Sequence, residues 1–252
     1  MKKIVLLFML SPIMLVSCFF QKESNHIELK TNSFLLVINE SGYLKNVIDL
    51  KSHTDYLYKD TLSPLMSIRS NGEIIKPQSA QILGDTIELQ YKSGIEAHLR
   101  VVQNSSHLSF ELLSVSHIQD VDLIIWGPYA LSMDEVIGET VGIVQGSEYA
   151  IGLQALNPKT LGGYPWNENY CMPQLDIFEN GDYSDLNEAG KRYVLYRVEA
   201  AKPTDFGSSL QAYCRKRDQD RVIENWDHPL YLAPAYDDGG FLGSRMALFG
   251  CP

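Results

Sequence analysis

The sequence predicts a mainly β protein: a large antiparallel two-sheet β-sandwich, with one C-terminal helix and a partial extra segment. Short apolar runs separated by turn-forming residues extend from Ser33 to Leu156. They correspond to about ten strands at spacings of roughly 8–15 residues. None of the runs has a helical period, and strands joined by short turns form antiparallel sheets that pack face to face.

The individual strands follow from alternation and turn signals. Ile87, Leu89 and Tyr91 alternate with polar residues, as a half-buried strand requires. The continuous apolar run Val121–Trp126 is typical of a central strand. Strands are predicted at residues 34–38, 43–50, 66–69, 82–83, 87–91, 97–102, 108–113, 121–126, 141–144, 149–156 and 191–200.

The last fifty residues have a different pattern. Thr204 and Asp205 are suited to cap a helix that would extend to about Gln219. Helical spacing is met by Phe206, Leu210, Tyr213, Cys214 and Arg217, and the apolar stripe of this helix would pack on the sandwich or on the segment that follows. A short apolar strand, Met246–Phe249, follows near the C-terminus with nothing after it to cover it. We therefore expect a sandwich domain over 33–200, and a helix and linker over 201–252 that lead to a missing C-terminal domain of a truncated chain.

The N-terminus resembles a bacterial lipoprotein signal. Lys2 and Lys3 precede an apolar run, Ile4–Val16, that is too short to cross a bilayer. The run ends in Leu-Val-Ser-Cys, which matches a lipobox with Cys18 as the lipidated residue. We expect residues 1–17 to be a signal peptide, residues 18–32 a tether, and the membrane a partner through the lipid anchor in the bacterial cell envelope.

Composition excludes one class of partner. The net charge is −10, and it becomes −12 once Lys2 and Lys3 are removed. The longest basic cluster is Arg215–Arg217, so no nucleic acid is expected to bind.

The remaining cysteines lack the paired spacing of zinc ligands, and we expect buried thiols, no metal and no cofactor. These cysteines are Cys171, Cys214 and Cys251.

Several segments resemble the N-terminal β-sandwich of bacterial multidomain glycoside hydrolases, a galactose mutarotase-like fold also called a supersandwich. They are residues 37–44 (VINESGYL), 126–128 (WGP), 137–142 and 150–154. Residues 237–244 resemble a linker that enters a catalytic barrel. In those enzymes the catalytic carboxylates lie mostly on the barrel. The resemblance therefore implies a non-catalytic module, or a truncated relative, with a downstream catalytic domain as a partner.

Aromatic and acidic residues suit a glycan ligand, because flat rings stack on sugar C–H faces and carboxylates accept hydrogen bonds from hydroxyls. The aromatic residues of the loop 157–190 have an alternative role in packing that loop against the sandwich or a partner domain. The candidate ligand-binding residues are Trp126, Tyr129, Tyr164, Trp166, Glu168, Tyr170, Asp237 and Asp238.

Three functions remain open from the sequence. The first is a lipid-anchored, non-catalytic carbohydrate-handling protein. The second is a small enzyme, such as an aldose epimerase or a glycosidase, and the third is a scaffold that docks a partner domain. We assign no catalytic residue, because the histidines, among them His98 and His107, lie in no catalytic motif. A His and a Glu within hydrogen-bond reach on a concave sheet face would favour the enzyme.

Overall fold

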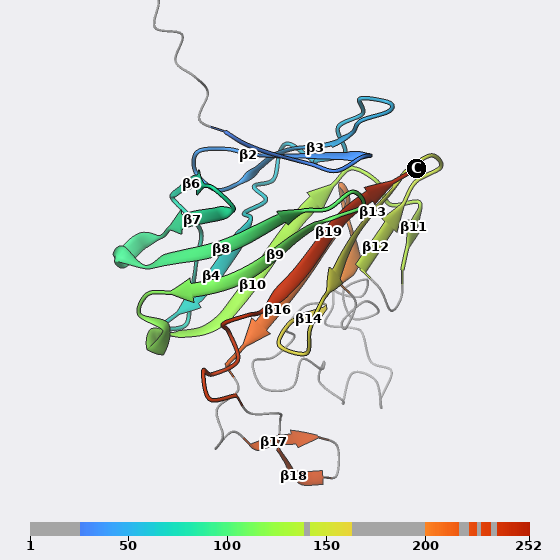
Figure 1. The fold of residues 1–252 in the computed structure, drawn as a ribbon. Coiled ribbons are helices and arrows are strands. Elements are labelled where there is room, and N and C mark those ends of the chain that lie inside the picture. The colour runs from blue at the N-terminus through green and yellow to red at the C-terminus, as the bar shows by residue number, and fades with distance from the viewer. Residues whose placement is uncertain (1–25, 139–141, 163–199, 217–221, 226–227, 233–235) are drawn as a thin grey trace, which may run out of the picture.

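The computed structural model describes residues 26–138, 142–162, 200–216, 222–225, 228–232 and 236–252 (Figure 1). Within these ranges the chain forms antiparallel sheets, and its only helical segments are the 3-10 turns Lys92–Gly94 and Ile118–Asp120. Figure 1 shows the two large sheets layered on each other, with a smaller sheet across one end. The predicted mainly β, sandwich-like fold is confirmed.

The eight-stranded sheet is built largely from strands that the alternation predicted. Its order is β11-β12-β13-β19-β9-β8-β7-β6, so β6 and β11 are its edge strands. The bounds are β6 Ser79–Leu83, β7 Thr86–Gln90, β8 Glu96–Gln103, β9 Leu108–Val115, β11 Val136–Ile137, β12 Gly142–Gln145, β13 Ala150–Ala155 and β19 Arg245–Cys251.

The second large sheet has the order β14-β16-β10-β4-β5, with β15 also paired to β16. A third sheet has the order β1-β2-β3, and β17 pairs with β18. The bounds are β1 Ile27–Lys30, β2 Phe34–Ile38, β3 Leu44–Asp49, β4 Met66–Ser70, β5 Glu73–Ile75, β10 Val121–Leu131, β14 Leu161–Gly162, β15 Ala201–Thr204, β16 Gly207–Arg215, β17 Val222–Asn225 and β18 His228–Leu232.

One hydrophobic core joins the three larger sheets. The inward residues of alternating strands are almost fully buried, as Ile87 and Leu89 of β7 illustrate. They meet Phe34 of the three-stranded sheet and Trp126 of β10 in the same cluster. Burial of large apolar side chains contributes about 1.5–3 kcal/mol each, so this cluster holds the layers together.

The predicted C-terminal helix is wrong. Residues 207–215 form β16, which lies between β10 on one side and β14 and β15 on the other. Leu210 faces the main core, whereas Tyr213 packs with Leu123 and Ile125 on the opposite face of the sheet. Both faces of β16 are buried, including its polar residues Ser208, Ser209 and Gln211, so burial along this strand does not follow an apolar–polar alternation. Its apolar residues Leu210, Tyr213 and Cys214 also satisfy a helical spacing.

The terminal apolar run is also not a separate element. It lies inside β19, which pairs with β13 on one side and β9 on the other in the middle of the eight-stranded sheet. Residue 200 is therefore not a boundary between the sandwich and a linker, because β15, β16 and β19 all belong to sandwich sheets. The uncovered strand that suggested a missing domain is covered within this fold.

Candidate functional site

Trp126 and Tyr129 are core residues, which corrects their assignment as glycan contacts. Their exposed fractions are 0% and 1%. The Trp126 Nε1–H donates to Ser244 Oγ at 3.2 Å, and the Tyr129 hydroxyl donates to the Leu65 carbonyl at 2.8 Å. Neither ring is open to a ligand, because both are enclosed and their polar atoms are satisfied inside the protein.

A register shift in β10 explains why both rings point inward. Trp126 lies opposite Ala212 and Tyr129 lies opposite Leu210, so β10 contains one extra residue between these pairs. Side chains three positions apart on a regular strand would point to opposite faces. The bulge at Gly127–Pro128 changes this alternation and directs both rings to the core. Gly127 has a φ of +91°, and a Cβ there would lie 2.9 Å from the Leu210 carbonyl oxygen.

Asp238 closes a turn in the segment that precedes β19. Its carboxylate accepts hydrogen bonds from Lys159 Nζ at 2.7 Å and from the Gly240 amide at 3.0 Å. Burial raises the pKa of Asp238, but these hydrogen bonds outweigh burial and lower it overall. Asp238 therefore has a structural role, while its neighbour Asp237 is exposed.

The other candidates have different outcomes. Cys214 is a buried thiol, as expected, and its Sγ–H donates to the Gly240 carbonyl, whereas Cys251 is exposed. No helix in the described part of the chain is long and apolar enough to cross a membrane. The lipidation residue Cys18, the loop residues Tyr164, Trp166, Glu168 and Tyr170, and Cys171 lie outside the described residues.

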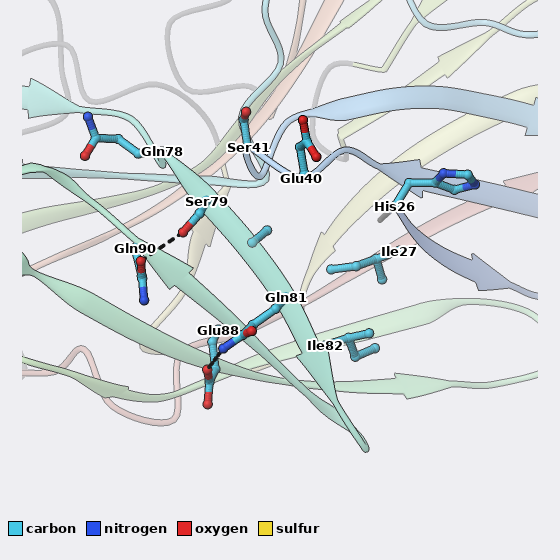
Figure 2. A pocket seen from close by; sticks show the side chains of 11 residues that line it. His26, Ile27, Glu40, Ser41, Gln78, Ser79, Gln81, Ile82, Glu88 and Gln90 are labelled. Atoms are coloured by element: carbon cyan, nitrogen blue, oxygen red, sulfur yellow. Dashed lines mark hydrogen bonds between the residues drawn. The ribbon is translucent and has the colours of Figure 1, made fainter. Parts of the chain in front are cut away.

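The structure instead brings polar residues together in a groove of about 700 Å³ beside the edge strand β6 (Figure 2). The groove lies between β6 and β7 on one side and β1 with the turn at residues 40–41 on the other. Eight of its eleven lining residues are polar, and Glu40, Gln78 and Gln81 are exposed. The lining consists of His26, Ile27, Glu40, Ser41, Gln78, Ser79, Ala80, Gln81, Ile82, Glu88 and Gln90.

The turn after β2 forms one wall of this groove. The Asn39 side chain accepts hydrogen bonds from the amides of Ser41 and Tyr43, each at 3.0 Å. The Ala80 amide donates to the Glu40 carbonyl at 2.8 Å, which ties the turn to β6. Gly42 permits this approach, because its φ is +84° and a Cβ would lie 2.9 Å from Pro77 Cβ.

Polar side chains of the groove continue in a row across four strands. Gln81 of β6 pairs with Glu88 of β7, which pairs with His98 of β8, which pairs with Ser114 of β9. Neighbours in this row are in contact: Gln81 Nε2 donates to Glu88, and His98 Nδ1 lies 2.8 Å from Ser114 Oγ. Cross-strand neighbours of this kind are held at fixed spacing by the sheet.

A second register shift completes the row. His98 lies opposite Ser114, but the next residue of β8, Leu99, lies opposite Leu112, so Leu113 is an extra residue in β9. Regular pairing would place Leu113 opposite His98 and leave the imidazole Nδ1 beside an apolar side chain. The bulge therefore supplies the hydroxyl partner of His98.

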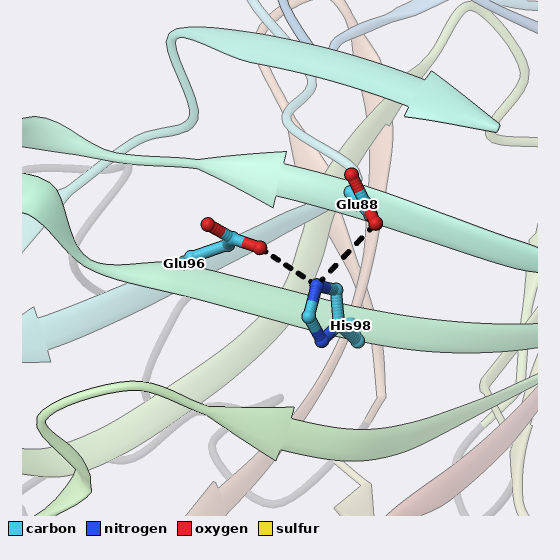
Figure 3. Close-up of side chains that lie close together, drawn as sticks. All are labelled: Glu88, Glu96 and His98. Atoms are coloured by element: carbon cyan, nitrogen blue, oxygen red, sulfur yellow. Dashed lines mark hydrogen bonds and ion pairs between the residues drawn. The ribbon is translucent and has the colours of Figure 1, made fainter. Parts of the chain in front are cut away.

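His98 also faces two carboxylates (Figure 3). Its Nε2 lies 2.7 Å from Glu96 Oε1 and 3.6 Å from Glu88 Oε1. Glu96 precedes His98 by two residues on β8, so the sheet places both on the same face. The sequence placed His98 in the predicted strand 97–102, but only pairing with β7 and β9 identified Glu88 and Ser114 as its neighbours.

The comparisons with known proteins give no family. No family model matches the sequence, and no curated protein matches it. The fold and the groove therefore define the class: a mainly β sandwich-like protein with a polar groove at a sheet edge.

Proposed function

We propose that this protein is a lipid-anchored, non-catalytic carbohydrate-handling protein that binds a neutral glycan in the groove beside β6. The observation that carries the proposal is the composition of that groove: carboxylate, amide and hydroxyl groups make up most of its lining. Its volume of about 700 Å³ is within the range of about 300–1,000 Å³ that is usual for ligand pockets.

The chemistry of the lining favours a ligand with many hydroxyls. Carboxylates accept hydrogen bonds, and amides both donate and accept, so Glu40, Gln78 and Gln81 complement sugar hydroxyls. Ile27 and Ile82 add apolar contacts suited to sugar C–H groups. Glu40 and Glu88 give the groove an acidic character that disfavours an anionic ligand. The proposed site thus differs from the aromatic loop inferred from the sequence.

The enzyme alternative has one observation in its favour, because His98 and Glu96 are within hydrogen-bond distance. An acid and a base that act on a sugar must each reach the reacting atoms. Here the two groups contact each other at 2.7 Å, which leaves no space for a substrate atom between them. This arrangement favours a binding role over aldose epimerase or glycosidase chemistry at these residues.

Binding of the full-length chain, purified in detergent, to an array of neutral and acidic glycans tests the proposal. The variant Glu40→Ala/Gln78→Ala removes two exposed groove side chains, and we expect it to weaken binding at least tenfold. Its matched control is Glu135→Ala/Gln145→Ala, which removes the same two side-chain types at the opposite edge of the sheet.

Each result has a definite meaning. Loss of binding in the groove variant but not in the control supports the proposal. Absence of binding to every glycan by the folded wild-type chain would refute it and favour a scaffold that docks a partner domain. Equal binding by both variants would place the ligand elsewhere. Release of a product or a change in optical rotation of an aldose would favour the enzyme.

The anchor is a separate part of this proposal. It is supported by the Leu-Val-Ser-Cys motif that ends at Cys18. Metabolic labelling with palmitate should give a labelled, membrane-associated wild-type protein. Cys18→Ala should abolish the label, and Cys251→Ala, which replaces an exposed cysteine in β19, serves as the control. A label retained in Cys18→Ala would refute this site of lipidation.

A further inference from the structure

We infer that Glu88, Glu96 and His98 form a binding site for a divalent transition-metal ion of the Zn²⁺ class on the outer face of the eight-stranded sheet. The inference is independent of glycan binding, although Glu88 also lines the groove. It departs from the expectation of no metal, which considered the cysteines only.

The donor set suits zinc in number and kind. One imidazole and two carboxylates supply three ligands, the number that zinc takes from the protein when a fourth position is left to water or a ligand. The three donor atoms lie within 4.8 Å of one another. An imidazole ligand favours Zn²⁺ and its neighbours over Ca²⁺ and Mg²⁺, which prefer oxygen donors.

The distances are close to those of a tetrahedral site. Metal–ligand bonds of about 2.0–2.2 Å place the ligand atoms of a tetrahedron about 3.3–3.6 Å apart. The separation of His98 Nε2 and Glu88 Oε1 is 3.6 Å, which already matches. The Glu96 carboxylate lies closer to Nε2, at 2.7 Å, and must move outward by a fraction of an ångström. Its side chain is 42% exposed, so it is free to do so.

Groups behind the ligands orient them. Ser114 Oγ lies 2.8 Å from His98 Nδ1, so it can accept a hydrogen bond from Nδ1–H and leave the Nε2 lone pair directed at the carboxylates. Gln81 holds the Oε2 atom of Glu88, which leaves Oε1 towards His98. Metal sites typically have such outer partners, whose loss weakens binding by about 10–100-fold. In this protein the bulge at Leu113 places Ser114 beside His98.

Isothermal titration of the full-length chain with Zn²⁺ tests the inference. We expect one site that Ca²⁺ and Mg²⁺ do not occupy, and a higher melting temperature in the presence of Zn²⁺. His98→Ala and Glu96→Gln should each lose at least 100-fold in affinity, and Ser114→Ala should lose about 10–100-fold. His107→Ala, which replaces a histidine in the turn before β9, is the matched control and should bind normally.

Two readouts separate this site from adventitious binding. Thiols also bind zinc, so Co²⁺ is used as a spectroscopic probe. At the proposed site it should give visible absorption without a thiolate charge-transfer band. Unaltered Zn²⁺ affinity in folded His98→Ala, or a cobalt spectrum with thiolate character, would overturn the inference. If His98→Ala loses Zn²⁺ binding but retains glycan binding, the result supports the metal site and leaves the proposed function intact.

Discussion

Replacement of Tyr129 by phenylalanine removes a single buried hydroxyl and distinguishes a core ring from a ligand-binding ring. The hydroxyl donates to the Leu65 carbonyl at 2.8 Å, and that carbonyl also accepts from the Gly127 amide at a longer 3.4 Å. The ring itself remains, so no large cavity forms. Leaving a buried acceptor poorly satisfied costs about 1–2 kcal/mol. For a chain of this size that lowers the melting temperature by roughly 2–8 °C.

The effect has a characteristic pH dependence. Burial raises the pKa of Tyr129 above its usual value near 10. The unfolded chain therefore loses this proton at a lower pH than the folded chain, and the contribution of Tyr129 to stability is lost as the pH rises above about 10. Phenylalanine has no such proton. The difference in unfolding free energy between wild type and Tyr129→Phe should consequently narrow above pH 10.

Chemical denaturation at pH 7 and above pH 10 measures both effects. Tyr58→Phe is the matched control, because Tyr58 stacks on Phe206 with ring centroids 4.4 Å apart and its hydroxyl has no hydrogen-bond partner among the described residues. It should change stability by less than about 0.5 kcal/mol. Unchanged stability of Tyr129→Phe combined with weaker glycan binding would refute the assignment of this ring to the core.

Two further substitutions test the groove wall and the sheet edge. Gly42→Ala should destabilise the protein by about 1–3 kcal/mol more than Gly84→Ala in thermal unfolding. Both glycines have positive φ, but only at Gly42 would an added Cβ lie close to another residue, Pro77. An equal loss of stability in the two variants would contradict this close contact. Burial lowers the pKa of Lys202 to about 8. Its charge therefore opposes folding at neutral pH, and this cost disappears as the pH rises from about 8 towards the unfolded value near 10.4. In urea denaturation, the unfolding free energy of wild type should rise relative to that of Lys202→Met between pH 8 and 9.5. If the unfolding free energies of the two proteins depend on pH in the same way, the amine of Lys202 is not buried as described.

The sequence by itself determined the strands whose two faces differ. Residues such as Ile87 and Leu89 alternate with polar neighbours because one face of β7 meets the core and the other meets solvent. The predicted strand 97–102, which contains His98, likewise lies within β8. Local patterning is sufficient in these segments, since the period of two follows directly from the backbone.

Tertiary structure decided what surrounds each strand, and that is where the sequence-based predictions were wrong. β16 is buried on both faces without an alternating pattern, and its apolar residues also satisfied a helical spacing. β19 pairs with strands that lie roughly 90–140 residues earlier in the chain. The bulge at Gly127–Pro128 directs Trp126 and Tyr129 to the core, and the bulge at Leu113 brings Ser114 to His98. Register between distant strands depends on the packing of whole sheets, and no local pattern specifies which polar side chains become neighbours.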